Sequence, residues 1–215
     1  MGILFIDSSS KKIEFGYSEN SDILFKMQLE PENNADTLIY YIHKFFLSNN
    51  ISLNKIEIVS LSNGPGSFTG LRISSAIAKG ICYSNHSKLI ELSTLDIIAN
   101  KKSSLNKTIP LISSNTKTNE YYYSEYINVE NKIERISEYK IDTIENILNE
   151  DALFLINEKF HAGFPDILKS RVADVSGLSN IDVMDKLTRL SIDRNKFGDY
   201  RISEPFYMKD FVPNI

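Results

Sequence analysis

The most informative stretch of the chain reads Ser62-Asn63-Gly64-Pro65-Gly66-Ser67-Phe68-Thr69-Gly70-Leu71-Arg72. It follows an apolar run at 56–61, which predicts a buried strand, and it leads into residues 70–83, which predict a helix. Glycines let the backbone approach a ligand or a partner closely, and the first amide groups of a helix can bind an anion. The stretch therefore predicts a strand–loop–helix unit of an α/β protein.

Two interpretations of this loop follow from its composition. The loop could bind an anion at the helix N-terminus, or it could be a plain turn in which Ser67 or Thr69 caps the helix. It lacks the Gly-Lys-Ser/Thr ending of the ATPase phosphate-binding loop, and its spacing differs from the dinucleotide fingerprint. The composition favours the plain turn, and both interpretations stay open.

Upstream of the loop, apolar segments separated by turn residues predict an antiparallel meander of strands at 3–6, 12–17 and 23–29. A helix is predicted at 36–46, and its N-cap candidates are Asn33, Asn34 and Asp36. Its apolar positions recur with helical spacing and are Leu38, Tyr41, Ile42, Phe45 and Phe46. Downstream of the loop, a strand at 89–92 and a helix capped by Ser93 complete the order βββαβα.

The same order begins again after residue 107. The predicted elements are strands at 108–112, 121–127 and 132–139, a helix at 142–148, a strand at 152–157, a helix at 181–192 and a last strand at 204–207. Two βββαβα units are the architecture of the actin-like ATPases, whose units have an RNase H-like fold. The sequence predicts this α/β fold, with an N-terminal lobe at 1–103 and a smaller, less regular C-terminal lobe at 104–215.

Composition limits the classes of protein that the chain can represent. A net charge of −4 over 215 residues argues against nonspecific nucleic-acid binding, which requires excess Lys and Arg. Cys82 is the only cysteine, so an intrachain disulfide and a cysteine-based zinc site are excluded. The start Met1–Asp7 indicates a first strand and not a signal peptide, and polar residues interrupt every apolar run. We expect a soluble cytoplasmic protein with no membrane association.

The first strand ends in Asp7-Ser8-Ser9-Ser10, the place where actin-like ATPases have a phosphate-facing turn. Asp7, Ser8 and Ser9 are therefore the candidate nucleotide-binding residues, although Asp followed by hydroxyls is also a common turn and the sequence favours a degenerate site. No catalytic residue is predicted, because Glu120 and Asp166 are isolated carboxylates. The histidines are His43, His86 and His161, none of which are four residues apart, so no metal site is predicted.

Residues 63–72 resemble the hallmark Gly-Pro-Gly-Ser-Phe-Thr-Gly-Val/Leu-Arg of the TsaB (YeaZ) family. The chain is similar to this family at Ile3–Ser9, Ala78–Gly80, Ser93–Leu95, Asn119–Tyr122 and Glu204–Lys209. The resemblance is strong over about residues 1–100 and patchy beyond. The family opens its second lobe with an Ile-Asp-Ala-Arg-like run, whereas this chain has Leu111-Ile112-Ser113-Ser114-Asn115. This difference argues against a ligand role for that turn.

The resemblance implies a scaffold or activator without a cofactor. Its partner is TsaD, which transfers threonylcarbamoyl to adenosine-37 of tRNAs reading ANN codons, and the ATPase TsaE joins the complex. The family forms a heterodimer with TsaD and a homodimer when alone, and it meets tRNA only through the complex. The interface residues that the resemblance implies are Leu38, Tyr41, Phe45, Arg72, Ser75, Ala76 and Lys79. The small and aromatic residues of the two helices fit an interface and a buried core equally well.

Two alternatives remain open at the level of the sequence. One is a self-contained nucleotide-binding kinase or hydrolase with the actin-like fold, which would use the turn at Asp7. The other is a peptidase relative, which only the ancestry of the superfamily supports. The absence of a His-x-x-x-His pair separates the chain from TsaD, whose family carries such a metal-binding pair.

Overall fold

The structure is a computed structural model that describes residues 1–29, 37–104, 107–115, 119–157 and 170–208. The chain forms two compact units. Unit 1 consists of Met1–Thr94 and Ser179–Pro205, and unit 2 consists of Leu95–Leu178 and the residues from Phe206. The first segment of unit 2, Leu95–Leu178, is thus inserted between the two segments of unit 1.

Unit 1 contains a five-stranded sheet in the order β3-β2-β1-β4-β5. Its strands are β1 (Gly2–Asp7), β2 (Ile13–Glu19), β3 (Asp22–Leu29), β4 (Ile56–Ser62) and β5 (Lys88–Leu92). The first three strands are antiparallel, and β1, β4 and β5 are parallel. The register of β1 and β2 places Asp7 directly opposite Glu14. With their helices, these strands confirm the predicted order βββαβα.

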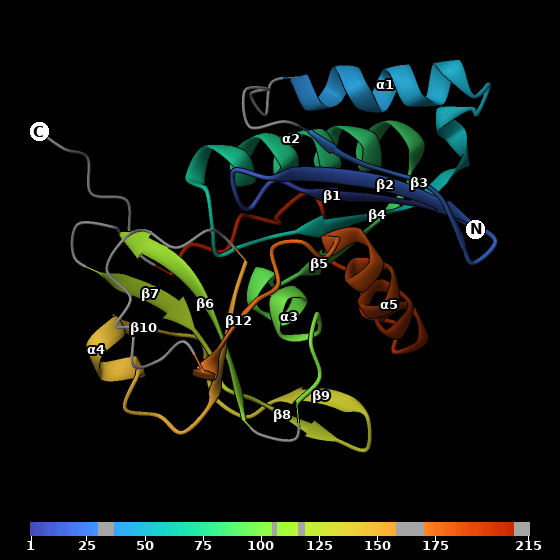
Figure 1. The fold of residues 1–215 in the computed structure, drawn as a ribbon. Helices are drawn as coiled ribbons and strands as arrows, with labels where there is room; N and C mark the ends of the chain where they lie inside the picture. The colour runs from blue at the N-terminus through green and yellow to red at the C-terminus, as the bar shows by residue number, and fades with distance from the viewer. Residues whose placement is uncertain (30–36, 105–106, 116–118, 158–169, 209–215) are drawn as a thin grey trace, which may run out of the picture. The chain divides into compact units, whose positions relative to one another are not determined.

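Helices cover both faces of this sheet (Figure 1). Helices α1 (Leu38–Ser48) and α2 (Phe68–Asn85) share one hydrophobic core with alternate strand residues such as Val59. Helix α5 (Asn180–Asp193) packs on the other face, where Thr188 is hydrogen-bonded to Ser60 at 2.7 Å. Because helices cover both faces of the sheet, β1 and β4 are almost continuously buried.

Unit 2 contains a seven-stranded sheet with the main order β10-β7-β6-β11-β12, and β8 pairs with β6 and β9. Its elements are α3 (Thr94–Ala99), β6 (Thr108–Asn115), β7 (Glu120–Tyr123), β8 (Tyr126–Val129), β9 (Lys132–Arg135), β10 (Lys140–Thr143), α4 (Ile144–Ile147), β11 (Leu153–Ile156) and β12 (Val172–Asp174). Two partly buried hydrogen bonds attach α3, because the hydroxyls of Tyr126 and Tyr139 donate to Asp96 at 2.6 and 3.0 Å.

The structure differs from the sequence predictions in several places. The predicted lobes, 1–103 and 104–215, differ from the two units because α5 packs on the sheet of unit 1 and α3 packs in unit 2. The single strand predicted at 121–127 is divided into β7 and β8, and residues 204–207 form no strand. The N-cap candidates at 33, 34 and 36 lie outside the described residues. In the part of the chain that the structure describes, no helix is long and apolar enough to cross a membrane.

A charged network links strands of unit 2 at their ends. The Nζ atom of Lys107 lies 3.1 Å from Oε2 of Glu125 and 2.6 Å from Oε2 of Glu150, and Lys140 donates to Glu125 at 2.9 Å. The hydrogen bonds from Lys140 and then Lys107 hold the pKa of Glu125 below its usual value, although burial opposes this shift. The carboxylates of Glu150 and Glu125 raise the pKa of Lys107, and Glu125 raises the pKa of Lys140.

We expect Glu125→Gln to lower the free energy of unfolding of unit 2 by about 1 kcal/mol at pH 7, because part of the network is open to solvent. A carboxylate with a lowered folded pKa stabilises above its unfolded pKa of about 4.3 and loses this effect as pH falls through the folded value. The difference between variant and wild type should therefore disappear below about pH 4. Denaturant unfolding from pH 3 to 8 measures it, with the exposed Glu134→Gln as the control. A difference that is independent of pH would contradict the electrostatic origin.

Candidate functional site

The turn after β1 is completely buried and internally hydrogen-bonded. Asp7 Oδ1 accepts hydrogen bonds from the backbone N–H of Ser9 at 2.9 Å and from its hydroxyl at 2.6 Å. Asp7 Oδ2 accepts a hydrogen bond from the side-chain amide of Asn180 at the start of α5. Asp7, Ser8 and Ser9 are at most 3% exposed. The candidate nucleotide-binding residues are thus brought together, but the polar groups of Asp7 and Ser9 bond to each other and to α5, and the hydroxyl of Ser8 bonds to Gly70.

The glycine-rich loop packs directly against this turn. The N–H of Ser67 donates to the carbonyl of Ser9 at 2.6 Å, and the hydroxyl of Ser8 donates to the carbonyl of Gly70 at 2.7 Å. A Cβ atom at Gly66 would lie 2.1 Å from the carbonyl oxygen of Ser9, and one at Gly70 would lie 2.0 Å from that of Ser8. These glycines are therefore required for contact with the chain's own first turn.

The rest of the loop is also fixed within unit 1. The hydroxyl of Ser67 accepts from the N–H of Gly70 at 3.3 Å, so Ser67 is the N-cap of α2, as the plain-turn interpretation predicts. The carbonyl of Gly64 accepts from the N–H of Thr94 at 2.8 Å. The side-chain amide of Asn63 donates to Glu91 at 2.7 Å. Of the other loop residues, Pro65 is buried, Phe68 is half-buried and Thr69 is exposed.

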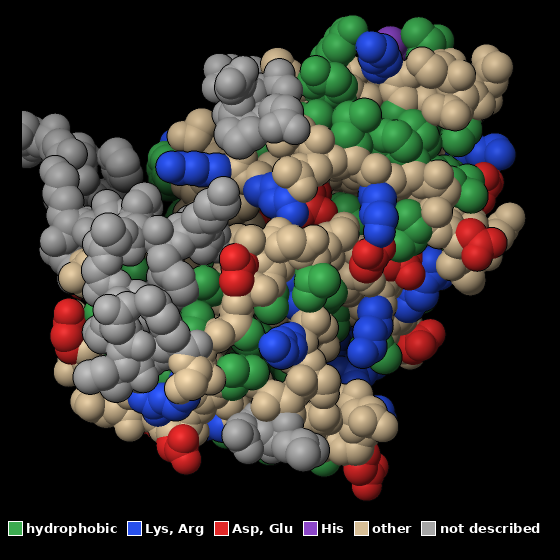
Figure 2. All heavy atoms as spheres, viewed as in Figure 1, with side chains coloured by type: hydrophobic (Ala, Val, Ile, Leu, Met, Phe, Trp, Pro, Cys, Tyr) green, Lys and Arg blue, Asp and Glu red, His purple; other side chains and the backbone are tan. Residues whose placement is uncertain are grey.

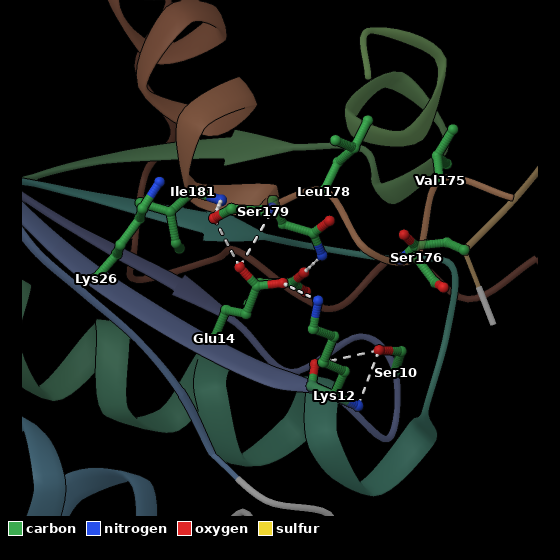
Figure 3. A network of polar contacts seen from close by, with 12 residues as sticks. Ser10, Lys12, Glu14, Lys26, Val175, Ser176, Leu178, Ser179 and Ile181 are labelled. Atoms are coloured by element: carbon green, nitrogen blue, oxygen red, sulfur yellow. Dashed lines mark hydrogen bonds and ion pairs between the residues drawn. The ribbon is translucent and has the colours of Figure 1, made fainter. Parts of the chain in front are cut away.

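A second buried carboxylate, Glu14, lies at the N-terminus of α5 (Figure 3). Glu14 Oε2 accepts from the hydroxyl of Ser179 at 2.9 Å and from the backbone N–H of Asn180 at 3.1 Å. Glu14 Oε1 lies 3.5 Å from the Nζ atom of Lys12. An anion at this position interacts favourably with the positive end of the helix dipole and with unbonded amides of the first turn. Glu14 therefore attaches the returning helix α5 to β2.

These contacts limit the chemistry that the turn can perform. The hydroxyl and the N–H of Ser9 are the donors that would face a phosphate, and both are bonded to Asp7. A phosphate would also approach two buried carboxylates, Asp7 and Glu14, which stand opposite each other on β1 and β2. The geometry supports a structural junction that joins the turn, the glycine-rich loop and α5.

Sequence reasoning missed Glu14 and Asn180. They are separated from each other by 166 residues, and Asn180 is 173 residues from Asp7. A local signal existed for the helix start, because Ser179 precedes the apolar pattern of α5 as an N-cap and accepts from the N–H of Ile181 at 3.2 Å. No local sequence pattern identifies Glu14 as the carboxylate that is hydrogen-bonded to the start of α5.

Helices α1 and α2 contain the predicted interface residues. In the structure, some of these residues are buried and others are exposed. Leu38, Phe45 and Ser75 are 0%, 8% and 4% exposed and lie in unit 1 itself, so the structure corrects their assignment to a partner surface. Tyr41 and Lys79 are half-buried, and Arg72 and Ala76 are exposed. Apolar residues that the prediction did not select are more exposed, and these are Ile39 (48%), Tyr40 (58%), Leu47 (67%) and Tyr83 (73%).

Other candidate groups have no arrangement that indicates catalysis. Cys82 is buried in α2, and burial raises the pKa of its thiol to about 11, which keeps it protonated at neutral pH. Among the residues that the structure describes, no group of three or more His, Cys, Asp or Glu side chains is placed to hold a metal ion. His161 and Asp166 lie outside the described residues.

Comparisons with known proteins agree with this two-unit architecture. A family model described as TsaD, tRNA N6-adenosine threonylcarbamoyltransferase, matches residues 31–195, about three quarters of the chain. The chain therefore belongs to this family of α/β proteins with the predicted actin-like architecture. Within the family, its curated relatives place it on the TsaB (YeaZ) branch.

Three of these relatives are named tRNA threonylcarbamoyladenosine biosynthesis protein TsaB. The protein of Buchnera aphidicola subsp. Baizongia pistaciae is 38% identical over 103 residues, 46% of each chain. That of Buchnera aphidicola subsp. Schizaphis graminum is 31% identical over 135 residues, 58% of this chain and 60% of the relative. That of Escherichia coli K12 is 26% identical over 136 residues, 62% and 58% of the two chains. The matched region thus spans about half to six tenths of the length of these relatives.

Two solved structures share the fold over nearly the whole chain. One is a Pseudomonas aeruginosa protein described as similar to the peptidase YeaZ, with a TM-score of 0.75 and 14% identity, covering 97% of this chain and 99% of the other. The second is YeaZ from Pseudomonas aeruginosa, with a TM-score of 0.72 and 13% identity, covering 96% and 100%. At this identity the two structures establish the fold, and they confirm the α/β class predicted from the sequence.

Two glycines of α2 offer a matched test of the loop junction. Gly70→Ala should destabilise unit 1 by about 2–4 kcal/mol, because the new methyl group would collide with the backbone of Ser8. Gly80→Ala should stabilise the same helix by about 0.5–1 kcal/mol, because no atom lies within 4 Å of its Cβ position. Denaturant unfolding measures both changes. Equal effects of the two variants would contradict the close approach at Gly70.

The Glu14 contact gives a second test. Glu14→Gln should destabilise unit 1 by about 1–3 kcal/mol, since a buried charged acceptor is replaced by a neutral amide at the N-terminus of α5. Hydrogen exchange should accelerate at residues 180–183, whose first-turn amides the carboxylate helps to hold. The exposed Glu57→Gln on β4 is the control. Unchanged exchange at the start of α5 would show that Glu14 does not hold the helix.

Proposed function

We propose that this chain is a non-catalytic subunit in the N6-threonylcarbamoylation of adenosine-37 in tRNAs that read ANN codons. Its family membership supports the proposal, and the curated relatives are named as threonylcarbamoyladenosine biosynthesis proteins. In this role the chain is the cytoplasmic heterodimer partner of a TsaD subunit, with TsaE joining the complex. It contacts tRNA through the complex, and it forms a homodimer when alone.

The observation that carries the proposal is the exposed surface of α1 and α2, here called the α1–α2 face. It consists of the exposed side chains of Ile39, Tyr40, Lys44, Leu47, Arg72, Ala76 and Tyr83, the exposed Gly80 and the half-buried Tyr41 and Lys79. Large exposed apolar side chains on one surface of a soluble protein mark interaction sites. Ala76 and Gly80 let a second helix approach α2 closely.

A charge in this face tests the proposed partnership. Ala76→Glu should abolish co-purification with the TsaD-family protein of the same genome and lower the rate of tRNA modification in a reconstituted system by at least about tenfold, because the carboxylate would be desolvated in the interface. Circular dichroism should be unchanged, since Ala76 is exposed. The control is Leu190→Glu, which places the same charge on α5, on the opposite face of the sheet.

Two results would overturn the proposal. One is the absence of any complex between wild type and the TsaD-family protein. The other is stoichiometric ATP binding that is lost in Asp7→Ala, which would establish a self-contained nucleotide-binding enzyme. The buried and internally bonded turn at Asp7 favours the subunit over this alternative, because its donors are already used within the fold.

A further inference from the structure

The glycine-rich loop contains the pair Asn63-Gly64, and asparagine is followed by glycine nowhere else in the chain. An asparagine side chain can react with the backbone nitrogen of the residue that follows it, and glycine has no Cβ atom to hinder the reaction. Asparagine is one of the thermolabile residues of proteins. The proposed function assigns no role to this pair. It is the place in the chain where such a reaction meets the least steric hindrance.

The reaction replaces the side-chain amide of Asn63 with a carboxylate. The backbone nitrogen of Gly64 loses its proton to solvent and attacks Cγ of Asn63, so that a succinimide ring forms. The bond between Cγ and Nδ2 breaks, and the nitrogen takes up a proton from solvent and leaves as ammonia. Water then opens the ring at either of its carbonyl groups, which gives aspartate or isoaspartate at this position. Water is the only other reactant.

Two hydrogen bonds hold the leaving nitrogen in the folded chain. Nδ2 of Asn63 donates to Oε1 of Glu91 on β5 at 2.7 Å and to the backbone carbonyl of Glu204 at 3.0 Å. All three residues belong to unit 1. Glu91 is itself held in place, because Oε1 also accepts from the hydroxyl of Ser203 at 2.6 Å. Nδ2 must break both of its hydrogen bonds, one of them to a carboxylate, before it can leave.

The oxygen of the same amide lacks the stabilisation that the reaction requires. Negative charge develops on Oδ1 of Asn63 when the nitrogen of Gly64 attacks. Among the residues that the structure describes, no donor is hydrogen-bonded to Oδ1, which is buried. A charge that develops on a buried oxygen is costly without a donor. The closed loop therefore slows the reaction at both ends of the amide, whereas water can donate to Oδ1 in an opened loop.

We infer that Asn63-Gly64 is a site of spontaneous deamidation and that Glu91 restrains the reaction as long as the loop is closed. Loops open locally at a lower free energy than the whole domain. In the aspartate product, an oxygen replaces Nδ2 within hydrogen-bond distance of Glu91, and the two carboxylates repel each other. An ionised carboxylate also has no proton to donate to the carbonyl of Glu204. The modification thus disconnects the segment at Glu204 from the glycine-rich loop. The inference does not depend on the proposed function.

Rates of deamidation test the restraint by Glu91. Folded wild type and variants are incubated at mildly alkaline pH, and mass spectrometry of peptides measures conversion of Asn63 to aspartate and isoaspartate. Glu91→Ala should raise the rate about tenfold, because the loss of a charge-assisted hydrogen bond favours opening by about this factor. Circular dichroism verifies that the variants are folded.

The matched control is Glu204→Ala, which should leave the rate unchanged. It removes an exposed carboxylate of the same segment and keeps the backbone carbonyl that accepts from Asn63. Figure 2 shows acidic side chains interspersed with basic ones on one face of the molecule, without an extended acidic patch in that view. A change in rate with Glu91→Ala alone would therefore report on the contact with Asn63. Equal rates in wild type and both variants would overturn the inference.

The unfolded chain provides a measurement that does not require a folded variant. In concentrated guanidinium chloride, wild type and both variants should deamidate at Asn63 at one common rate, and this rate should exceed that of folded wild type. Asn20, which precedes Ser21 in an exposed turn, is the internal standard and should convert more slowly than Asn63 in the unfolded chain. No conversion at Asn63 in the unfolded chain, or a folded rate equal to the unfolded rate, would overturn the inference.

Asn63→Asp reproduces the aspartate product and tests its effect on the structure. The N–H of Ser203 donates to the carbonyl of Asp199 at 2.9 Å, and its hydrogen exchange should accelerate about tenfold, the factor that corresponds to repulsion of two carboxylates at hydrogen-bond distance in water. Asn63→Ala removes the same two hydrogen bonds without adding a charge and should accelerate exchange less. Unchanged exchange at Ser203 in Asn63→Asp would show that the modification does not disconnect the segment.

Discussion

The fold of unit 1 depends on one buried turn, Asp7 to Ser9, that three distant parts of the chain touch. The backbone of the glycine-rich loop lies against Ser8 and Ser9, and Asn180 at the start of α5 bonds to Asp7. Asp7 and Glu14 face each other across β1 and β2, and two buried carboxylates at this spacing would destabilise the sheet without donors. Ser9, Ser179, Asn180 and Lys12 provide these donors and charges.

This junction explains why the chain can return to unit 1 after the inserted unit 2. The start of α5 is fixed by polar groups at Ser179 and Asn180, and its body is fixed by buried side chains such as Ile181 and Met184. The polar contacts are directional and the apolar contacts are not, so the carboxylates determine where the helix begins. The same donors would be needed to hold a phosphate at the turn. Within unit 1 these donors are already bonded to Asp7 and Glu14.

Local patterns in the sequence predicted most elements of unit 1 because local physical chemistry fixes them. Ser67 is the N-cap of α2, and the helical spacing of apolar residues located α1 within two residues. Unit 2 was harder to predict, because its short strands alternate with turns that periodicity cannot place, as in the division of 121–127 into β7 and β8. The contacts of Asp7 and Glu14 with α5 depend on pairing across more than 160 residues, which no local pattern encodes.

The predicted interface residues of α1 show that apolar residues of one helix can differ widely in exposure. Leu38 and Phe45 belong to the apolar stripe of α1 and are buried. A helix that packs on one sheet buries a single stripe of this kind. The residues left over, Ile39, Tyr40 and Leu47, fall between the repeats and are exposed. Apolar residues in excess of one buried stripe can mark an interface, whereas Leu38, Tyr41 and Phe45 of the predicted set belong to the stripe itself. We therefore propose the exposed Ile39, Tyr40 and Leu47, and not the buried Leu38 and Phe45, as the apolar interface candidates of α1.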